Sequence, residues 1–463
     1  MSQSLQEKFH KDAEVKSFDK EHRRKLRFNI SQYDKTVVKG KHQFANLELA
    51  KERAASKKFK AIENLDKYLI EFEANFTKNG GKVIWAQNDE EARQEILKIF
   101  KEANAKLTVK SKSMTTEEIH LNHFLEGNGI EAVETDLGEY IVQLAGETPY
   151  HIVTPAMHKS KEDVAELFHE KAGLPAGSTP QEVTAYVRKV LREKYQQAGV
   201  GISGGNFLIA DAGAIALTEN EGNAYLSVGF PKIHIAIVGI EKVIPSVKDL
   251  GLFWPLLSTH GTGQNVTVYN HIVSGPRKHN EVDGPDEMYV ILLDNGRSDL
   301  LAELEQRQAL HCIRCGACLN GCPVYQSVGG HTYGTTYSGP IGSVITPHYK
   351  GMESFKHLSY ASSLCGKCTE VCPVRIDLHK LLITNRSDAT QAGQVTTLEK
   401  RIIYFWRKGM LSRKMMDMGS SGIKNMVLHY ALKGSWGKHR SIPQIAPKSF
   451  SKLYRERKGF FPE

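Results

Sequence analysis

All seven cysteines of this 463-residue chain lie between Cys312 and Cys372, and no other feature constrains the fold as strongly. A secreted protein held by disulfides would normally spread an even number of cysteines over its loops. An odd number within one short segment indicates metal binding in a reducing compartment. The first residues, MSQSLQEKFHKDAEV, contain no apolar signal-peptide core. We therefore expect a cytoplasmic protein, either free or held peripherally at a membrane through partners.

The first cysteine run, HCIRCGACLNGCPVY, places Cys312, Cys315, Cys318 and Cys322 in the spacing C-x2-C-x2-C-x3-C, followed by proline. This is the spacing of bacterial ferredoxins. Two-residue gaps allow a tight loop to direct three thiolates at one cluster, and Gly316 lets the backbone approach that cluster closely. Zinc sites also use paired C-x2-C units, but they do not require a Cys-Pro ending in both runs. The run therefore predicts an iron–sulfur cluster.

The second run, LCGKCTEVCPV, has Ser362 where the spacing requires a further cysteine. In two-cluster ferredoxins the fourth cysteine of each run binds the cluster of the other run. Applied to this chain, the crossing leaves only the second cluster one ligand short. The predicted ligands are Cys312, Cys315, Cys318 and Cys372 for cluster one, and Cys322, Cys365 and Cys368 for cluster two.

The sequence leaves three states open for the second cluster. In the first, it is a [4Fe–4S] centre whose fourth ligand is Ser362, Ser363, a nearby histidine or water. In the second, it is a [3Fe–4S] centre. In the third, it is a [4Fe–4S] centre with one labile iron. A [4Fe–4S] cluster is the expectation for both sites. Ser362 can also simply end the preceding helix without touching iron.

Three basic residues, Arg314, Lys367 and Arg375, lie within or beside the two runs. Positive charge near a cluster favours its reduced, more negative form. The same side chains could instead form a docking rim for another protein.

Strands and helices alternate from residue 82 to residue 295. Short apolar segments at 82–86, 106–111, 130–136 and 288–295 have the composition of buried strands, and Asn88, Thr115 and Thr179 are placed to cap the helices between them. This pattern predicts an α/β domain with a mostly parallel sheet. GVGISG at 199–204 resembles a dinucleotide fingerprint, but a helical pattern precedes it, so we interpret its glycines as a helix stop and a loop.

The chain divides into four predicted segments by composition and pattern. Both ends are basic: residues 1–60 hold sixteen Lys/Arg against eight Asp/Glu, and residues 391–463 hold fifteen against four. Such ends suit acidic protein surfaces, nucleic acid or simple solvation. The segments are a basic helical N-terminal segment (1–65), the α/β domain (66–297), a helical two-cluster ferredoxin-like domain (298–390) and a basic C-terminal region (391–463).

Several stretches resemble the lactate utilisation protein B family, the iron–sulfur subunits of bacterial L-lactate oxidation systems. They are VKSKSMTTEEI, ETDLGEYIVQLAGE, GISGGNFLIADAGAIALTENEGN and the two cysteine runs. The resemblance covers nearly the whole chain. It implies that the middle segment is a lactate-utilisation domain, similar in fold to the isomerase and CoA-transferase-like α/β group. It also implies that all seven cysteines are cluster ligands, and that the missing eighth is a family trait.

The same resemblance implies two partner proteins in the oxidation of L-lactate to pyruvate. One carries cysteine-rich electron-transfer domains, and the other is a small protein with the same α/β domain. The downstream electron acceptor is not identified.

A basic loop in the α/β domain is one candidate binding site. Lys110, Ser111, Lys112 and Ser113 lie between a predicted strand and the helix capped at Thr115. Cations beside free helical N–H groups suit a carboxylate or a phosphate. A solvated basic loop is the competing interpretation.

Two glutamates and two histidines are further candidates. Glu219 and Glu221 are two residues apart in a β-like stretch and so share one face; CoA-transferase-like enzymes use glutamate, although a solvated face explains the pair as well. His260 and His271 could line the same cleft, or be structural.

Three functions are compatible with these observations. The chain is predicted to be an electron-transfer subunit; alternatively, its α/β domain itself binds or oxidises the hydroxy acid, with the clusters as an internal relay. A redox sensor that binds nucleic acid is the third, but no helix-turn-helix or RNA-binding signature is found, so nucleic acid is not an expected partner.

No run of about 18 apolar residues occurs, so no transmembrane segment is expected.

Overall fold

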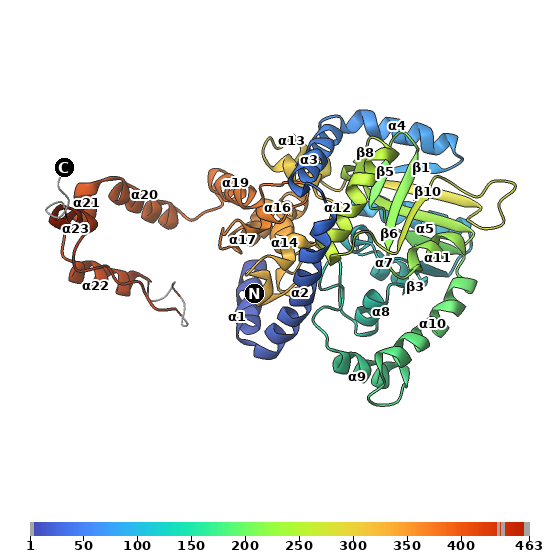
Figure 1. The fold of residues 1–463 in the computed structure, drawn as a ribbon, viewed down its shortest axis with the longest axis horizontal. Coiled ribbons are helices and arrows are strands. Elements are labelled where there is room, and N and C mark those ends of the chain that lie inside the picture. The colour runs from blue at the N-terminus through green and yellow to red at the C-terminus, as the bar shows by residue number, and fades with distance from the viewer. Residues whose placement is uncertain (1–3, 433–435, 437–439, 458–463) are drawn as a thin grey trace. The chain divides into compact units, whose positions relative to one another are not determined.

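The computed structural model describes residues 4–432, 436 and 440–457 (Figure 1). By their contacts, the residues group into two units, Met1–Ala389 and Thr390–Glu463. The first unit contains both β-sheets and all seven cysteines.

A six-stranded sheet forms the centre of the α/β domain. Its order is β1-β10-β7-β4-β2-β3, and every neighbouring pair is parallel. A parallel sheet of this kind confirms the predicted fold class. The strands are β1 (Lys82–Ala86), β2 (Leu107–Lys110), β3 (Glu131–Glu134), β4 (Val200–Ser203), β7 (Ile233–Gly239) and β10 (Glu287–Leu293).

Both faces of this sheet are covered, as its near-continuous apolar strands require. Along β10, Met288 and Val290 point into one core and Tyr289 and Ile291 into the other. The helices around the sheet are α4 (Leu65–Lys78), α5 (Asp89–Glu102), α6 (Met114–Glu118), α7 (Leu121–Gly127), α8 (Leu137–Leu144), α9 (Lys161–Ala172), α10 (Pro180–Gln197) and α11 (Asn223–Gly229).

A smaller mixed sheet packs against the same core. Its order is β8-β5-β6-β9, in which β6 is antiparallel to both of its neighbours. The short helix α12 (Leu250–Thr262) follows β8. The strands are β5 (Phe207–Ile209), β6 (Ala214–Glu219), β8 (Val243–Ile244) and β9 (Tyr269–Val273).

Helix caps show which local predictions succeeded. Asn88 accepts a hydrogen bond from the Glu91 backbone, and Thr179 forms a capping box with Glu182, both as predicted. Thr115 was the wrong residue: Ser113 caps α6, because the chain already turns into the helix at Met114.

The interpretation of GVGISG as a loop was also wrong. Val200 and Ile202 point into the core from β4, which pairs with β2 on one side and β7 on the other. Gly201 is required because a Cβ there would lie 1.8 Å from the Ser227 carbonyl oxygen. The glycine therefore allows α11 to pack against the strand, and it does not interrupt it.

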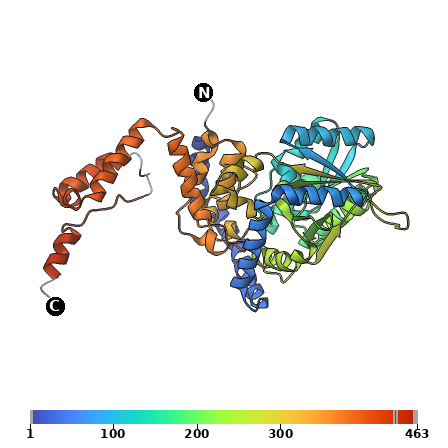
Figure 2. The ribbon, with the colours of Figure 1, turned by 90° about the horizontal axis from the view of Figure 1, so that it is seen from above.

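One hydrophobic core joins the N-terminal helices, the small sheet and the cysteine-rich segment. Figures 1 and 2 show α1 and α2 beside the helices of that segment, with which they are in contact. The helices are α1 (Leu5–Phe18), α2 (Lys20–Gly40), α3 (Leu47–Glu63), α13 (Arg297–Ala302), α14 (Ala317–Asn320), α15 (Tyr325–Val328), α16 (Gly339–Lys350), α17 (Met352–Tyr360), α18 (Lys367–Glu370) and α19 (Leu378–Gln391); short 3-10 turns are η1 (Lys41–Gln43), η2 (Ile240–Lys242), η3 (Val247–Asp249), η4 (Gln306–His311) and η5 (His331–Tyr333).

The second unit consists of helices without a buried core. No described residue between 390 and 457 is buried. Across the described residues of the whole chain, no helix is both long and apolar enough to cross a membrane. The helices of this unit are α20 (Thr397–Leu411), α21 (Arg413–Asp417), α22 (Ser421–Leu432) and α23 (Phe450–Arg457).

Candidate metal centre and adjacent pocket

The two cysteine runs fold into the same local backbone. Gly316 and Gly366 have φ angles of 80° and 78°, and each precedes a single helical turn, α14 or α18. Two residues before each glycine, Arg314 and Leu364 also have positive φ, 60° and 53°. Non-glycine residues rarely adopt this conformation, so its repetition shows that both loops meet the same geometric requirement.

Four sulfurs gather around one small cavity, which is lined by Cys312, Cys315, Cys318 and Cys372. Burial, and then the Cys372 and Cys312 sulfurs, raise the pKa of the Cys315 thiol. Burial also raises the pKa of Cys372 to about 12. The remaining lining is mainly apolar: Ile152, Ile313, Gly316, Ile341, Pro373, Val374, Ile376 and Leu378.

The other three cysteines form a second group. Burial, and then the Cys322 and Cys365 sulfurs, raise the pKa of Cys368 to about 11. Cys322 and Cys368 are buried, whereas Cys365 is exposed. Each group thus takes cysteines from both runs, in the same division as the predicted ligand sets. The ligand assignment itself stays a prediction.

Backbone N–H groups point at the sulfurs of the first group. The Arg314 N–H donates to Cys312 Sγ at 3.4 Å, and the Ile376 N–H donates to Cys372 Sγ at 3.3 Å. In the second run the Leu364 N–H donates to Ser362 Oγ at 3.1 Å. Leu364 corresponds to Arg314, so the Ser362 oxygen lies in the loop position that the Cys312 sulfur has in the first run.

These residues fit iron–sulfur clusters. Buried thiols with raised pKa values stay protonated at neutral pH unless a cation binds them, and a coordinated thiol loses its proton. Backbone N–H groups directed at sulfur are one of the means by which proteins tune cluster potentials. The cavity therefore has the donors and the apolar surroundings that a cluster requires.

Buried charges surround the first group. Arg297 donates to both carboxylate oxygens of Glu118, at 2.9 and 2.8 Å, and to Glu241 at 2.5 Å. Arg314 contacts Glu241 at 3.5 Å and stacks on Tyr337 with its guanidinium 4.4 Å from the ring centre. Burial opposes ionisation of Glu241, but Arg297 and Arg314 outweigh it and lower its pKa to about 2. Glu241 is therefore a stable carboxylate beside the cysteine loop.

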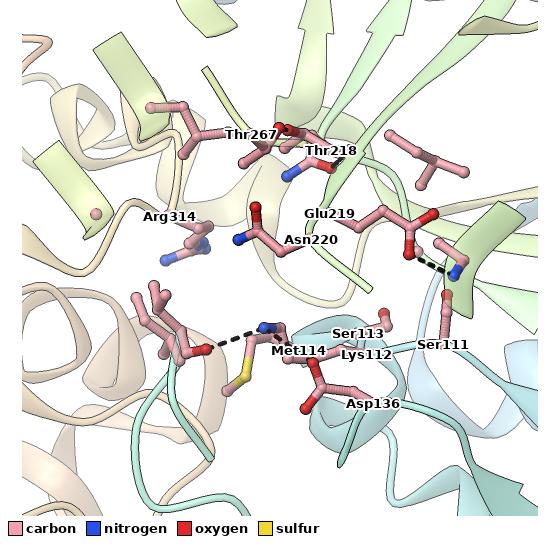
Figure 3. Close-up of a pocket in the computed structure, with 18 of the residues that line it drawn as sticks. Ser111, Lys112, Ser113, Met114, Asp136, Thr218, Glu219, Asn220, Thr267 and Arg314 are labelled. Carbon is pink, nitrogen blue, oxygen red and sulfur yellow. Dashed lines mark hydrogen bonds and ion pairs between the residues drawn. The ribbon is translucent and has the colours of Figure 1, made fainter. Parts of the chain in front are cut away.

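A pocket of about 380 Å³ lies at the carboxyl edge of the parallel sheet (Figure 3). Its walls include residues that follow β2, β3, β4 and β7, which are neighbours in the sheet. Open α/β sheets bind ligands at this edge. Arg314 and Cys315 of the first cysteine run complete the wall.

This pocket and the cavity of the first sulfur group adjoin each other. Cys315 and Ile152 line both. The helix α12 closes another side, and a Cβ at Gly261 would lie 3.1 Å from the Cys315 carbonyl oxygen. The α/β domain and the cysteine loop are therefore in direct contact at this point.

The predicted basic loop divides between two environments. Lys110 is fully buried, with Glu134 at 2.7 Å and Glu117 at 3.4 Å, so it is neither solvated nor part of the pocket. Lys112 does line the pocket, where it contacts Asp136 at 3.5 Å and donates to the Val153 carbonyl at 2.9 Å. Ser111 and Ser113 are also in the lining.

Glu219 and Glu221 both line the pocket. The Glu219 side chain is only 8% exposed, so the solvated-face interpretation was wrong for it, whereas Glu221 is exposed. Glu219 accepts from the backbone N–H groups of Ala224 and Tyr225, and it faces His271 at 3.0 Å. Partial burial of its carboxylate, and then Asp136, raise the pKa of Glu221. Glu219 thus bonds to two backbone N–H groups and His271, whereas Glu221 accepts from the Leu137 backbone N–H.

The two histidines are not among the residues that line the pocket. His260 is buried and its Nδ1 bonds to the Leu256 carbonyl, within its own helix. His271 pairs with Glu219 from outside the cavity. Both fit the structural interpretation better than a role in the cleft.

Lys242 is a pocket residue that the sequence did not single out. It lies just after β7, and burial, followed by Arg314, lowers its pKa to about 8. The available signal was a charge directly after a buried parallel strand, because such positions meet at one edge of the sheet. Asn220, which also lines the pocket, follows β6 of the smaller sheet and was missed as well.

Comparison with known proteins adds to this geometry. The LUD domain family matches residues 69–293, and the 4Fe-4S dicluster domain family matches residues 308–376. Lactate utilization protein B of Bacillus cytotoxicus is 42% identical over 432 residues, 91% of each chain. Lactate utilization protein B of Bacillus thuringiensis is 45% identical over 384 residues, 83% of this chain and 81% of that one. All seven cysteines fall within the matched dicluster segment.

Proposed function

The chain belongs to the lactate utilization protein B family, and on that premise we propose that it is the iron–sulfur electron-transfer subunit of a multi-subunit system that oxidises L-lactate to pyruvate. The names of its relatives and the 4Fe-4S dicluster domain support a role in lactate utilisation. The observation that carries the electron-transfer role is the division of the seven sulfurs into two adjoining groups, each drawn from both runs.

Two clusters are proposed, with the ligand sets that the crossing predicts. Clusters held by these thiols would supply one-electron transfer at potentials tuned by the surrounding protein. The chain's own part is to hold the sulfurs, shield the first group from water and place Arg314 and two backbone N–H groups near it. Interleaved runs require the two sites to be close, which suits a relay.

The second site is proposed to hold four irons, with oxygen in place of the fourth sulfur. The matching hydrogen bonds at Cys312 and Ser362 support this choice, because Ser362 Oγ occupies the position equivalent to a ligand atom. Either this oxygen or a solvent molecule beside it would complete the set.

Two other lactate-utilisation subunits are the proposed partners, and the C-terminal unit is suited to contact one of them. Its helix α20 exposes a set of large apolar side chains beside basic ones, and the region 391–463 has a large excess of positive charge. Such a surface suits an acidic partner with apolar pockets. The exposed apolar residues of α20 are Leu398, Ile402, Ile403, Tyr404, Phe405, Trp406, Met410 and Leu411.

We also propose a cytoplasmic location, because seven free cysteines are typical of a reducing compartment. Any attachment to a membrane would then be made by the partners.

A Cys315→Ser variant tests the electron-transfer role. We expect it to abolish lactate-dependent reduction of an acceptor by the anaerobically purified complex, while both partners still co-purify. Ser354→Ala, at an exposed residue outside both cysteine runs, is the matched control and should retain full electron flow. Unchanged electron flow in Cys315→Ser would contradict the proposal.

A second function is favoured by one observation: the sheet-edge pocket adjoins Cys315. On this alternative the α/β domain itself binds or oxidises the hydroxy acid, and the clusters carry electrons away from it. The isolated chain, given L-lactate and an artificial electron acceptor, separates the two functions. Turnover without partners would favour the alternative, and its absence would favour the subunit role.

A further inference from the structure

We propose that the sheet-edge pocket binds a small 2-hydroxy or 2-oxo monocarboxylate, with the carboxylate held by Lys242 and Arg314 beside Cys315. This inference rests on the proposed function, which supplies the class of substrate. It goes further in assigning a binding site to this chain and to named residues.

The first observation is that two buried cations face the pocket without full compensation. Lys242 is 8% exposed and makes no hydrogen bond or ion pair with any residue in the described part of the chain. Arg314 Nη1 is buried and lacks a hydrogen-bond partner there, while its only carboxylate contact is Glu241 at 3.5 Å. Buried cations without partners are costly, and an anion between them would remove that cost.

The second observation is that Glu241 is already committed elsewhere. Its Oε2 accepts from Arg297 at 2.5 Å, and its Oε1 is the atom at 3.5 Å from Arg314. One carboxylate is therefore shared by two arginines, and Lys242 makes no ion pair with it. The arrangement leaves room for a second carboxylate, which guanidinium and ammonium groups bind through charge-assisted hydrogen bonds.

The rest of the pocket suits the other groups of such an acid. Figure 3 shows Arg314 and Asn220 on one side of the cavity, with the Lys112–Asp136 pair below them in this view. The Asn220 amide can donate to and accept from a hydroxyl or oxo group. Leu217, Leu257 and Val153 provide apolar wall for a short alkyl group.

The volume and position are consistent with a ligand site. A cavity of about 380 Å³ is at the lower end of the range of roughly 300–1,000 Å³ seen for small-molecule sites. Its location at the carboxyl ends of neighbouring parallel strands is the place where open α/β sheets bind ligands. A ligand there would be separated from the first sulfur group only by the residues that line both cavities.

The two cations could have another role than ligand binding, and the experiment must distinguish the two roles. Lys242 and Arg314 also lie near Cys312, so their charge could serve only to balance thiolates and bound iron. In that case Lys242→Met would change the cluster potential and leave ligand binding as it was. Binding therefore has to be measured directly.

The test is isothermal titration of the anaerobic, cluster-loaded full chain with L-lactate, pyruvate, acetate and inorganic phosphate. We expect L-lactate or pyruvate to bind, and Lys242→Met to weaken that binding by about tenfold or more, since a charged hydrogen bond is lost. Lys242→Arg, which keeps the charge, should bind within a few-fold of the parent. Lys248→Met makes the same change at an exposed residue and should have no effect. Iron content and visible spectrum confirm that each variant is folded and loaded.

Several results would overturn the inference: no binding of either acid, equal binding by Lys242→Met, or phosphate or acetate binding as tightly as both acids. If the acids fail to bind while the assembled complex still transfers electrons from L-lactate, this inference fails and the proposed function stands. If the acids bind but Cys315→Ser retains electron flow, the proposed function fails and the binding site stands.

Discussion

The two cysteine runs share a backbone and differ in their surroundings. Both turn through a positive-φ residue and a positive-φ glycine into one helical turn. Around the first run, Cys315 and Cys318 are buried beside Arg314 and Glu241; in the second, Cys365 is exposed and Lys367 pairs with Glu370 at the surface. The comparison shows that spacing determines how a loop presents its ligands, whereas packing determines the charge and water access around them.

The largest expected effect is the difference between the EPR signals of the Cys372→Ser and Cys365→Ser variants. If the ligands cross between runs, Cys372→Ser removes a ligand of the buried site although it lies in the second run, and Cys365→Ser affects only the exposed site. We expect each variant to lose roughly half of the iron, but a different EPR signal in each. Anaerobic EPR with iron and sulfide analysis is the measurement. Loss of the same signal in both variants would refute the crossing.

The next comparison is between the two arginines beside the runs. Arg314→Met removes a buried ion pair and a stacking contact, so we expect a loss of about 3 kcal/mol in the free energy of unfolding. Arg375 is partly exposed and pairs with Glu48 and Glu52 at 2.9 and 3.0 Å, so Arg375→Met should cost under about 1 kcal/mol. Urea unfolding followed by circular dichroism compares them. Equal losses would mean that packing does not distinguish the runs.

A smaller difference is expected between the two loop glycines. Alanine at either position adopts an unfavourable positive φ. At Gly316 the added Cβ would also lie 3.0 Å from Val153 and 3.1 Å from His151, whereas at Gly366 nothing lies within 4 Å. Gly316→Ala should therefore be less stable than Gly366→Ala by about 1–2 kcal/mol. The same urea series measures this, and the opposite order would contradict it.

The smallest expected change in stability, with a clear spectroscopic effect, comes from Ser362→Cys. The Leu364 N–H already donates to Ser362 Oγ, so a sulfur in that place should complete the second site. We expect more iron retained after exposure to air and a shifted EPR signal. Ser354→Cys, at an exposed residue outside both cysteine runs, is the control and should behave like the parent. Identical spectra for Ser362→Cys and the parent would show that Ser362 is not at the ligand position.

Local patterns were sufficient where the interactions themselves are local. The Asn88 and Thr179 caps bond to backbone groups three residues away, and both were predicted. β4 was misread because its assignment depends on long-range contacts. Glycines at 199, 201 and 204 favour a turn locally, but pairing with β2 and β7 and contact with α11 make the segment a strand.

The candidate pocket shows the same limit. Lys112, Glu219 and Glu221 could be named from the sequence, but not whether they were solvated, since burial depends on the whole fold. Lys242 was missed because it becomes a candidate binding residue only together with Arg314. That residue is 72 positions away in the sequence and lines the same pocket.

The sequence by itself indicated the iron–sulfur domain and the α/β class of the middle segment, which are confirmed, and it predicted a one-ligand deficit at Ser362. These follow from residue spacing and periodicity over a few positions. Only the tertiary structure decided that Cys365 is exposed while Cys315 is buried, and that the sheet-edge pocket adjoins Cys315. The reason is physical: ligand spacing is a property of one loop, whereas burial and a shared wall arise when segments distant in the chain pack into one core.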